Sequence, residues 1–212
     1  MVKALVLAAA AAALLGAGPA CGGEAPQPAV VTVLVDRPGG VPGRATGFVA
    51  ADERVVTVAH VLDGGGAVAV RVQGGGERRA RVVRVDRAAD LALLEVPASE
   101  PRGVALASAT STASLSSGGR EARVLGARDG SLRARRVEVR RRIVARVRDS
   151  AGPRVYTRRA LVLAGDVAGG DSGAPVVDGD GRLLGVVFAR SRREPGTAYA
   201  VDAGSVDRLL GR

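Results

Sequence analysis

Residues 169–189 read GGDSGAPVVDGDGRLLGVVFA, a glycine-rich polar segment around Ser172 followed by two short apolar segments. PVVD and RLLGVVFA are rich in Val and Leu, and the DGDG between them tolerates the positive φ of a tight turn. The pair is therefore predicted to form a β-hairpin. Gly170 and Gly173 flank the serine, and their missing Cβ atoms let a ligand approach the backbone. Ser172 is expected on a loop that enters this hairpin, either as a turn residue or as a nucleophile.

The rest of the chain favours an all-β protein with a core of small aliphatic side chains. Its 212 residues include only two Phe and two Tyr, and short Val-rich segments recur at the spacing of antiparallel strands. A small, polar segment around residues 99–119 is expected to connect two β-halves, at about 29–100 and 118–202. The last segment, 203–211, is predicted to form a short helix capped by Ser205.

The first 21 residues are predicted to be a signal peptide or a lipoprotein signal, followed by a linker over 22–28. An apolar segment after Lys3 ends at Cys21, a candidate lipidation site, and an uncleaved membrane anchor is the alternative. Cys21 is the only cysteine, so no internal disulfide is expected. With a single His and a single Cys, no metal site of the usual His/Cys type and no cofactor are expected.

The net charge of +10 comes almost entirely from arginine, since Lys3 is the only lysine. Basic proteins often bind nucleic acid or anionic surfaces, and residues 133–148 are the candidate segment for such binding. The chain has few aromatic side chains to stack on bases, and its arginines alternate with apolar residues in strand-like segments. The favoured interpretation is a solvated strand face, and no nucleic-acid partner is expected.

A serine nucleophile needs a base, and His60 is the only histidine in the chain. It follows the predicted strand VVTVA, where a loop can hold it at the rim of a barrel. Asp63, Asp86 and Asp90 are the candidates for the carboxylate that orients it. Asp90 is preferred because it directly precedes the apolar LALLEV, whereas Asp86 lies in an exposed-looking turn.

The order of these residues separates the classes of serine hydrolase. The α/β-hydrolases place the histidine after the serine, and Ala174 breaks their GxSxG pattern; the subtilisin order requires an aspartate before His60 in an α/β chain. The order His60, Asp90, Ser172 is that of chymotrypsin.

Four segments in this order, TGFVA, VVTVAHVLDG, DLALLEV and GGDSGAPVVDGDGRLLGVVFA, resemble the trypsin-like serine peptidases, especially bacterial extracytoplasmic members such as the periplasmic acid-resistance proteases. The resemblance implies two six-stranded antiparallel β-barrels, a short C-terminal helix and an active site between the barrels. It also implies that Ser172 is the nucleophile, His60 the general base and Asp90 the group that orients His60. The backbone N–H groups of Gly170 and Ser172 would form the oxyanion hole.

The chain also departs from the family pattern. Ala174 replaces the commoner glycine of GDSGG, and no Ile-Val-Gly-Gly amino terminus is visible, so Asp171 must find a partner other than a new N-terminus. Asp166, six residues before the serine, is expected at the base of a specificity pocket that favours Arg or Lys. Phe188 and Arg190 are expected to line this pocket, and Arg190 could neutralise Asp166 or block the pocket.

Together these features predict an exported serine endopeptidase that acts on proteins or peptides in the periplasm or at the cell envelope, with possible attachment to the membrane through its N-terminus. The alternative is a protease-fold binding or scaffold module with little or no turnover.

Overall fold

The computed structural model describes residues 29–51, 54–72, 76–96, 119–129 and 131–212. The predicted signal and linker, Cys21 and most of the predicted connector lie outside the described residues. Within the described residues, no helix is long and apolar enough to cross a membrane. The same part of the chain contains no group of three or more His, Cys, Asp or Glu side chains that could hold a metal ion.

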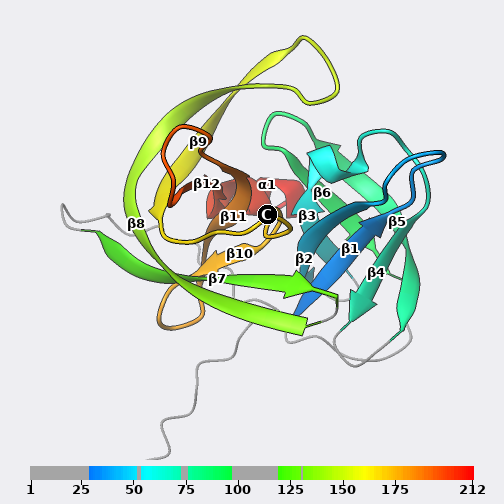
Figure 1. Cartoon of the computed structure of the whole chain (residues 1–212), viewed down its shortest axis with the longest axis horizontal. Coiled ribbons are helices and arrows are strands. Elements are labelled where there is room, and N and C mark those ends of the chain that lie inside the picture. The colour runs from blue at the N-terminus through cyan, green and yellow to red at the C-terminus, as the bar shows by residue number, and fades with distance from the viewer. Residues whose placement is uncertain (1–28, 52–53, 73–75, 97–118, 130) are drawn as a thin grey trace, which may run out of the picture.

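Two six-stranded antiparallel barrels lie side by side (Figure 1). The first has the strand order β1-β2-β3-β6-β5-β4 and closes through the pairing of β1 with β4. Its strands are β1 (Val30–Val35), β2 (Gly43–Ala51), β3 (Arg54–Val58), β4 (Val68–Val72), β5 (Glu77–Asp86) and β6 (Leu91–Glu95). The one-turn helix η1 (Ala59–Leu62) directly follows β3.

The second barrel has the order β10-β11-β12-β9-β8-β7 and closes through the pairing of β10 with β7. Its strands are β7 (Arg120–Arg128), β8 (Ser131–Arg148), β9 (Val155–Ala164), β10 (Pro175–Val177), β11 (Leu183–Arg190) and β12 (Thr197–Asp202). The helix α1 (Ala203–Leu210) ends the fold. The prediction of an all-β protein with two six-stranded barrels and a short C-terminal helix is confirmed, and β10 and β11 form the predicted hairpin.

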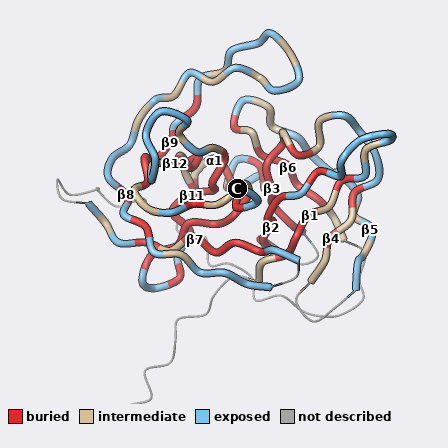
Figure 2. Tube along the Cα trace, viewed as in Figure 1, coloured by how far each residue is buried: buried red, intermediate tan, exposed pale blue. Residues whose placement is uncertain are grey.

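The barrel interiors are packed with Val, Leu and Ala, as the composition predicts, and Phe48 is fully buried among them. Figure 2 shows the buried residues along the inner strands of both barrels, while the outer hairpins are exposed. Along much of β8, exposed residues alternate with buried or half-buried ones. The arginines of this strand are exposed except for the half-buried Arg135. The arginine-rich segment therefore presents an exposed strand face, and its interpretation as a solvated face without a nucleic-acid partner stays a prediction.

Helix α1 contacts β11 and β12 of the second barrel and β5 and β6 of the first. The predicted cap was wrong: the N-cap is Asp202, whose carboxylate accepts the backbone N–H and the hydroxyl of Ser205 from inside the helix. A carboxylate at the helix start satisfies a free N–H and favours the helix dipole. At the other end, Nη1 of Arg84 donates to the carbonyl of Leu209 at 2.9 Å, so the helix is bonded to the first barrel.

The β8–β9 hairpin extends beyond the second barrel (Figure 1) and contacts the first. Near its turn, the Ser150 hydroxyl donates to Asp63, and Asp149 lies 3.9 Å from Nη1 of Arg87. Asp63 directly follows η1, and Arg87 lies in the turn between β5 and β6. The hairpin therefore connects the second barrel to the two loops that carry His60 and Asp90.

Candidate active site

His60 and Asp90 are in direct contact. Nδ1 of His60 is 2.9 Å from Oδ2 of Asp90, and the backbone N–H of His60 donates to Oδ1 at 2.9 Å. Both side chains are largely shielded, with 32% of the His60 side chain and 14% of the Asp90 side chain exposed. A carboxylate in this position keeps the imidazole proton on Nδ1 and leaves Nε2 as a proton acceptor.

The turn between β5 and β6 presents Asp90 to His60 in an unusual backbone conformation. Asp90 has a φ of +59°, a left-handed conformation that Asp tolerates better than most residues. The N–H of Asp90 donates to the carbonyl of Arg87 at 3.3 Å, and the carbonyl of Asp90 accepts the N–H of Ala59 at 3.0 Å. The second bond joins the turn directly to η1. The backbone thus links the two loops independently of the contact between the His60 and Asp90 side chains.

The other two candidate carboxylates have different partners. Asp86 accepts the N–H of Ala89 at 3.0 Å and so stabilises the turn before Asp90. Asp63 pairs with Arg87 and accepts the Ser150 hydroxyl. Among the three aspartates considered from the sequence, Asp90 is the one whose carboxylate contacts the His60 ring.

The loop that carries Ser172 is bonded to the first barrel through its backbone. The carbonyl of Ser172 accepts the N–H of Thr46 at 2.8 Å, and the Thr46 hydroxyl donates to the carbonyl of Gly170 at 2.9 Å. Thr46 is fully buried, and Thr57 donates its hydroxyl to the Thr46 carbonyl at 2.7 Å. Thr57 lies on β3, the strand that leads into His60. Thr46 and Thr57 therefore link the serine loop to the strand that precedes His60.

Gly173 is required by this packing. Its φ is +85°, and a Cβ at this position would lie 2.0 Å from the carbonyl oxygen of Thr46 and 2.8 Å from the Thr57 hydroxyl. Only glycine allows the serine loop to lie this close to β2. Gly170, also predicted from the sequence, has a φ of +95°.

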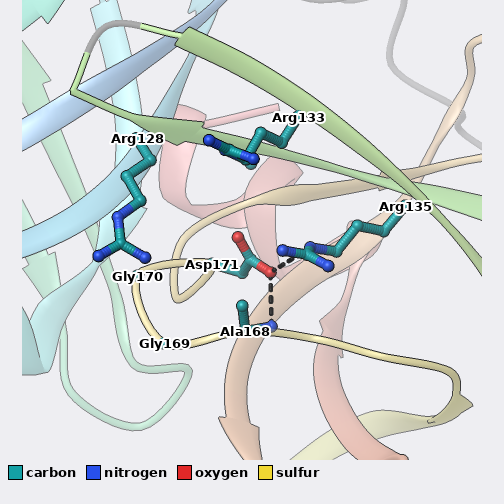
Figure 3. Close-up of a pocket in the computed structure, with 8 residues that line it drawn as sticks. Arg128, Arg133, Arg135, Ala168, Gly169, Gly170 and Asp171 are labelled. Atoms are coloured by element: carbon teal, nitrogen blue, oxygen red, sulfur yellow. Dashed lines mark hydrogen bonds and ion pairs between the residues drawn. The ribbon is translucent and has the colours of Figure 1, made fainter.

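Asp171, directly before the serine, pairs with Arg135 of β8 (Figure 3). Its carboxylate is 9% exposed, accepts the N–H of Ala168 at 2.7 Å and lies 3.4 Å from Nε of Arg135. The partner expected for Asp171 is therefore an arginine of the same barrel. This ion pair and the Ala168 bond fix the backbone on the N-terminal side of Ser172.

A cavity of about 160 Å³ lies beside this loop, lined by Arg128, Arg133 and Arg135 on one side and by residues 168–171 on the other (Figure 3). The positive charge of these arginines is offset locally. Arg135 also pairs with Asp166 at 3.0 Å, and Arg128 lies 3.9 Å from Asp129.

Of the three residues expected to set specificity, Asp166 departs from the expected arrangement. The Asp166 side chain is 88% exposed and pairs with Arg135, so it lies at the surface and not at the base of an enclosed pocket. Arg190 is exposed at the end of β11. Phe188 is 7% exposed and packs against Tyr199, with ring centroids 6.4 Å apart. The position of Asp166 relative to Ser172 in the sequence did not predict its location, because the course of the chain between them places its side chain at the surface.

Sequence reasoning missed three side chains that hold the site: Thr46, Arg135 and Arg158. Arg158 of β9 is buried, and its Nη1 lies 3.4 Å from Oδ2 of Asp90. Each of the three contacts a segment far away in the chain, and two of them are arginines in a chain rich in arginine. The one available signal was the TGFVA segment, in which Thr46 is the polar residue among otherwise apolar ones.

Replacing Gly173 by alanine is expected to lower the free energy of unfolding by about 3 kcal/mol. The left-handed conformation costs an L-residue about 1–2 kcal/mol, and overpacking adds about 1–3 kcal/mol. Gly179→Ala is the matched control, because no heavy atom lies within 4 Å of the Cβ it would add and its φ is not positive. Urea denaturation of both variants checks this; equal stability of the two would contradict the packing described here.

Comparison with known proteins gives a consistent result. A family model described as a trypsin-like peptidase domain matches residues 45–186. The serine proteases MT3772 and Rv3671c, from two strains of Mycobacterium tuberculosis, are each 35% identical to this chain over 169 residues, which is 79% of this chain and 41% of each relative. The chain thus spans about two fifths of the length of these curated relatives.

Solved structures of the M. tuberculosis protein have the same fold. The active form of the Rv3671c protease superposes with a TM-score of 0.79 at 33% identity, covering 88% of this chain and 81% of the other. Its inactive form gives a TM-score of 0.70 at 32% identity, covering 86% and 87%. The HtrA-type protease AlgW with a tripeptide, at 21% identity and a TM-score of 0.67 over 89% of this chain and 60% of the other, shares the fold.

Proposed function

Because the chain belongs to the family of trypsin-like peptidase domains, we propose that it is an exported serine endopeptidase that cleaves proteins or peptides through an acyl-enzyme. The observation that carries this proposal is the contact of His60 with Asp90, in which the ring nitrogen and the backbone N–H of His60 share one carboxylate. In a chain with a single histidine, this contact provides the base that a serine nucleophile needs.

In the proposed reaction, Oγ of Ser172 attacks the carbonyl carbon of the scissile peptide bond while Nε2 of His60 takes the hydroxyl proton. The Asp90 carboxylate accepts a hydrogen bond from the Nδ1–H of His60 and stabilises the imidazolium that forms. His60 then gives its proton to the leaving amine as the C–N bond breaks. A water molecule, deprotonated by His60, hydrolyses the resulting ester and restores Ser172.

The oxyanion of each tetrahedral intermediate is proposed to bind the N–H groups of Gly170 and Ser172. Such a donor typically contributes about 10²- to 10³-fold to the rate, because it stabilises charge that develops in the transition state. Fixed geometry is a condition for this effect. The bonds from Thr46 to the carbonyls of Gly170 and Ser172, and the pair of Asp171 with Arg135, support such a fixed loop.

The location is proposed from the sequence of residues 1–21, with its apolar segment and Cys21. Export to the periplasm or cell envelope follows from this signal, with attachment to the membrane through a lipid on Cys21. Radiolabelled palmitate incorporated by the wild-type chain but not by Cys21→Ser in the producing cell would support the lipid anchor; equal incorporation would contradict it.

The activity is tested by incubating the purified protein with unfolded casein and mapping the new peptide ends by mass spectrometry. Cuts at internal peptide bonds, made in proportion to enzyme concentration, are expected. Casein left intact by correctly folded protein would contradict the proposal and favour a binding or scaffold module.

A further inference from the structure

Arg158 brings a buried positive charge from the second barrel to Asp90. It lies on β9, its side chain is 5% exposed, and its Nη1 is 3.4 Å from Oδ2 of Asp90, the same oxygen that faces Nδ1 of His60. Its Nη2 donates to the carbonyl of Arg87 at 3.5 Å. The guanidinium therefore reaches both the carboxylate and the backbone of the turn that presents it.

This arrangement is a costly way to stabilise a fold. Nε and Nη1 of Arg158 are buried without a hydrogen-bond partner, and the guanidinium carbon lies 5.0 Å from the centre of the Phe188 ring. Desolvation of a charge is expensive, and apolar replacements of buried ion pairs are often neutral or stabilising. Packing alone therefore gives little reason for an arginine here, whereas its position beside Asp90 gives a specific one.

Asp90 also needs support from outside its own turn. A non-glycine residue with a φ of +59° is held in place only when its surroundings fix it. The β8–β9 hairpin supplies contacts from the opposite barrel: Arg158 to Asp90, Asp149 to Arg87, and Ser150 to Asp63. Of these, the contact of Arg158 is the one made with the carboxylate that faces His60.

We propose that Arg158 is a positioning residue that holds the Asp90 carboxylate against His60 from the second barrel. The inference rests on the proposed function. The guanidinium and the imidazole contact the same carboxylate oxygen, so loss of the guanidinium leaves the carboxylate free to turn away from Nδ1 of His60. The charged groups around Asp90 are His60 from η1, Arg158 from β9 and, on its own turn, Arg87, whose charge is shared with Asp63 and Asp149.

The first test needs no substrate. Because His60 is the only histidine, its ring signals in an NMR spectrum are unambiguous. In Arg158→Met, the Nδ1–H proton that His60 shares with Asp90 is expected to exchange faster with water, so that its signal broadens or is lost. Arg159→Met is the matched control, since Arg159 is the next residue of the same strand and is exposed; its Nδ1–H signal should equal that of the wild type.

The second test is kinetic. Arg158→Met is expected to lower kcat on a peptide substrate by about 10- to 100-fold through misplacement of the base, with KM changed less than threefold. Arg158→Lys keeps the charge but lacks the planar fork, so it should lower kcat only several-fold. The kcat of Arg158→Lys also tests the proposal if the Arg158→Met variant does not fold.

The two tests separate this inference from the function on which it rests. An unchanged Nδ1–H signal in folded Arg158→Met, or a kcat equal to that of Arg159→Met, would overturn the role of Arg158 even in an active enzyme. A wild-type protein without hydrolytic activity would overturn the proposed function, and the NMR spectra would still decide whether Arg158 holds Asp90 against His60.

Discussion

Replacing Ser172 by alanine is expected to lower the rate of peptide hydrolysis by about 10⁶-fold, because the change removes the oxygen that forms the acyl-enzyme. The fold should be unaffected. The hydrogen bonds described above between the serine loop and the first barrel use backbone carbonyls of the loop, including that of Ser172 itself, and an alanine retains them. The residual rate, measured by release of a fluorophore from a peptide substrate, would reflect binding and the oxyanion hole alone.

Ser205→Ala is the control for this variant. It deletes the same hydroxyl group in α1, where Ser205 donates to Asp202, and it should leave the hydrolysis rate within about twofold of the wild type. Activity in Ser172→Ala equal to that in Ser205→Ala would assign the nucleophile to another residue.

Replacing Asp90 by asparagine is expected to lower kcat by about 10⁴-fold with little loss of stability. Asparagine tolerates the positive φ of this position, and its amide oxygen can still accept the backbone N–H of His60. Its NH₂ group, however, would donate to Nδ1 and shift the ring proton to Nε2. His60 would then have no lone pair facing the serine hydroxyl and could not act as a base.

Asp86→Asn is the matched control. It makes the same change of a carboxylate to an amide four residues before Asp90, at the end of β5. Asp86 accepts the N–H of Ala89, and an amide oxygen can do the same, so this variant should keep nearly the full kcat. A loss in Asp86→Asn as large as that in Asp90→Asn would mean that the turn, and not the Asp90 carboxylate, controls the rate.

Much of the fold could be predicted from the sequence because its signals are local. The alternation of apolar and polar residues marks the strands, and DGDG marks the hairpin: Gly181 takes a φ of +77°, and Asp178 accepts the N–H groups of Asp180 and Arg182. The N-cap of α1 was missed because both Asp202 and Ser205 are good capping residues. The geometry places the start of the helix at the end of β12, which leaves Asp202 in the cap position.

The choice of Asp90 over Asp86 and Asp63 could also be made from the sequence, because Asp90 directly precedes a buried strand that fixes its place. The supporting residues could not. Thr46 meets the serine loop 124 residues further along the chain at Gly170, and Arg158 meets Asp90 across the two barrels. Closed β-barrels bring distant segments together through register and twist, which short-range patterns do not contain.

Arginine composition added to this difficulty. In a chain with a net charge of +10, nothing in the sequence separates the buried Arg158 from its exposed neighbour Arg159, or Arg135 from the exposed arginines of β8. Their burial depends on which face of a strand points inward, and that face is set by the pairing of β8 with β9 inside the closed barrel.

The most direct test of the central claim, that Ser172 is a nucleophile activated by His60, is reaction with a fluorophosphonate followed by intact-protein mass spectrometry. The wild-type protein is expected to gain one phosphonyl group, located on the peptide that contains Ser172, while Ser172→Ala gains none and Asp90→Asn reacts far more slowly. Correctly folded wild-type protein that gains no phosphonyl group, or Ser172→Ala protein that is labelled as fast as the wild type, would contradict the claim.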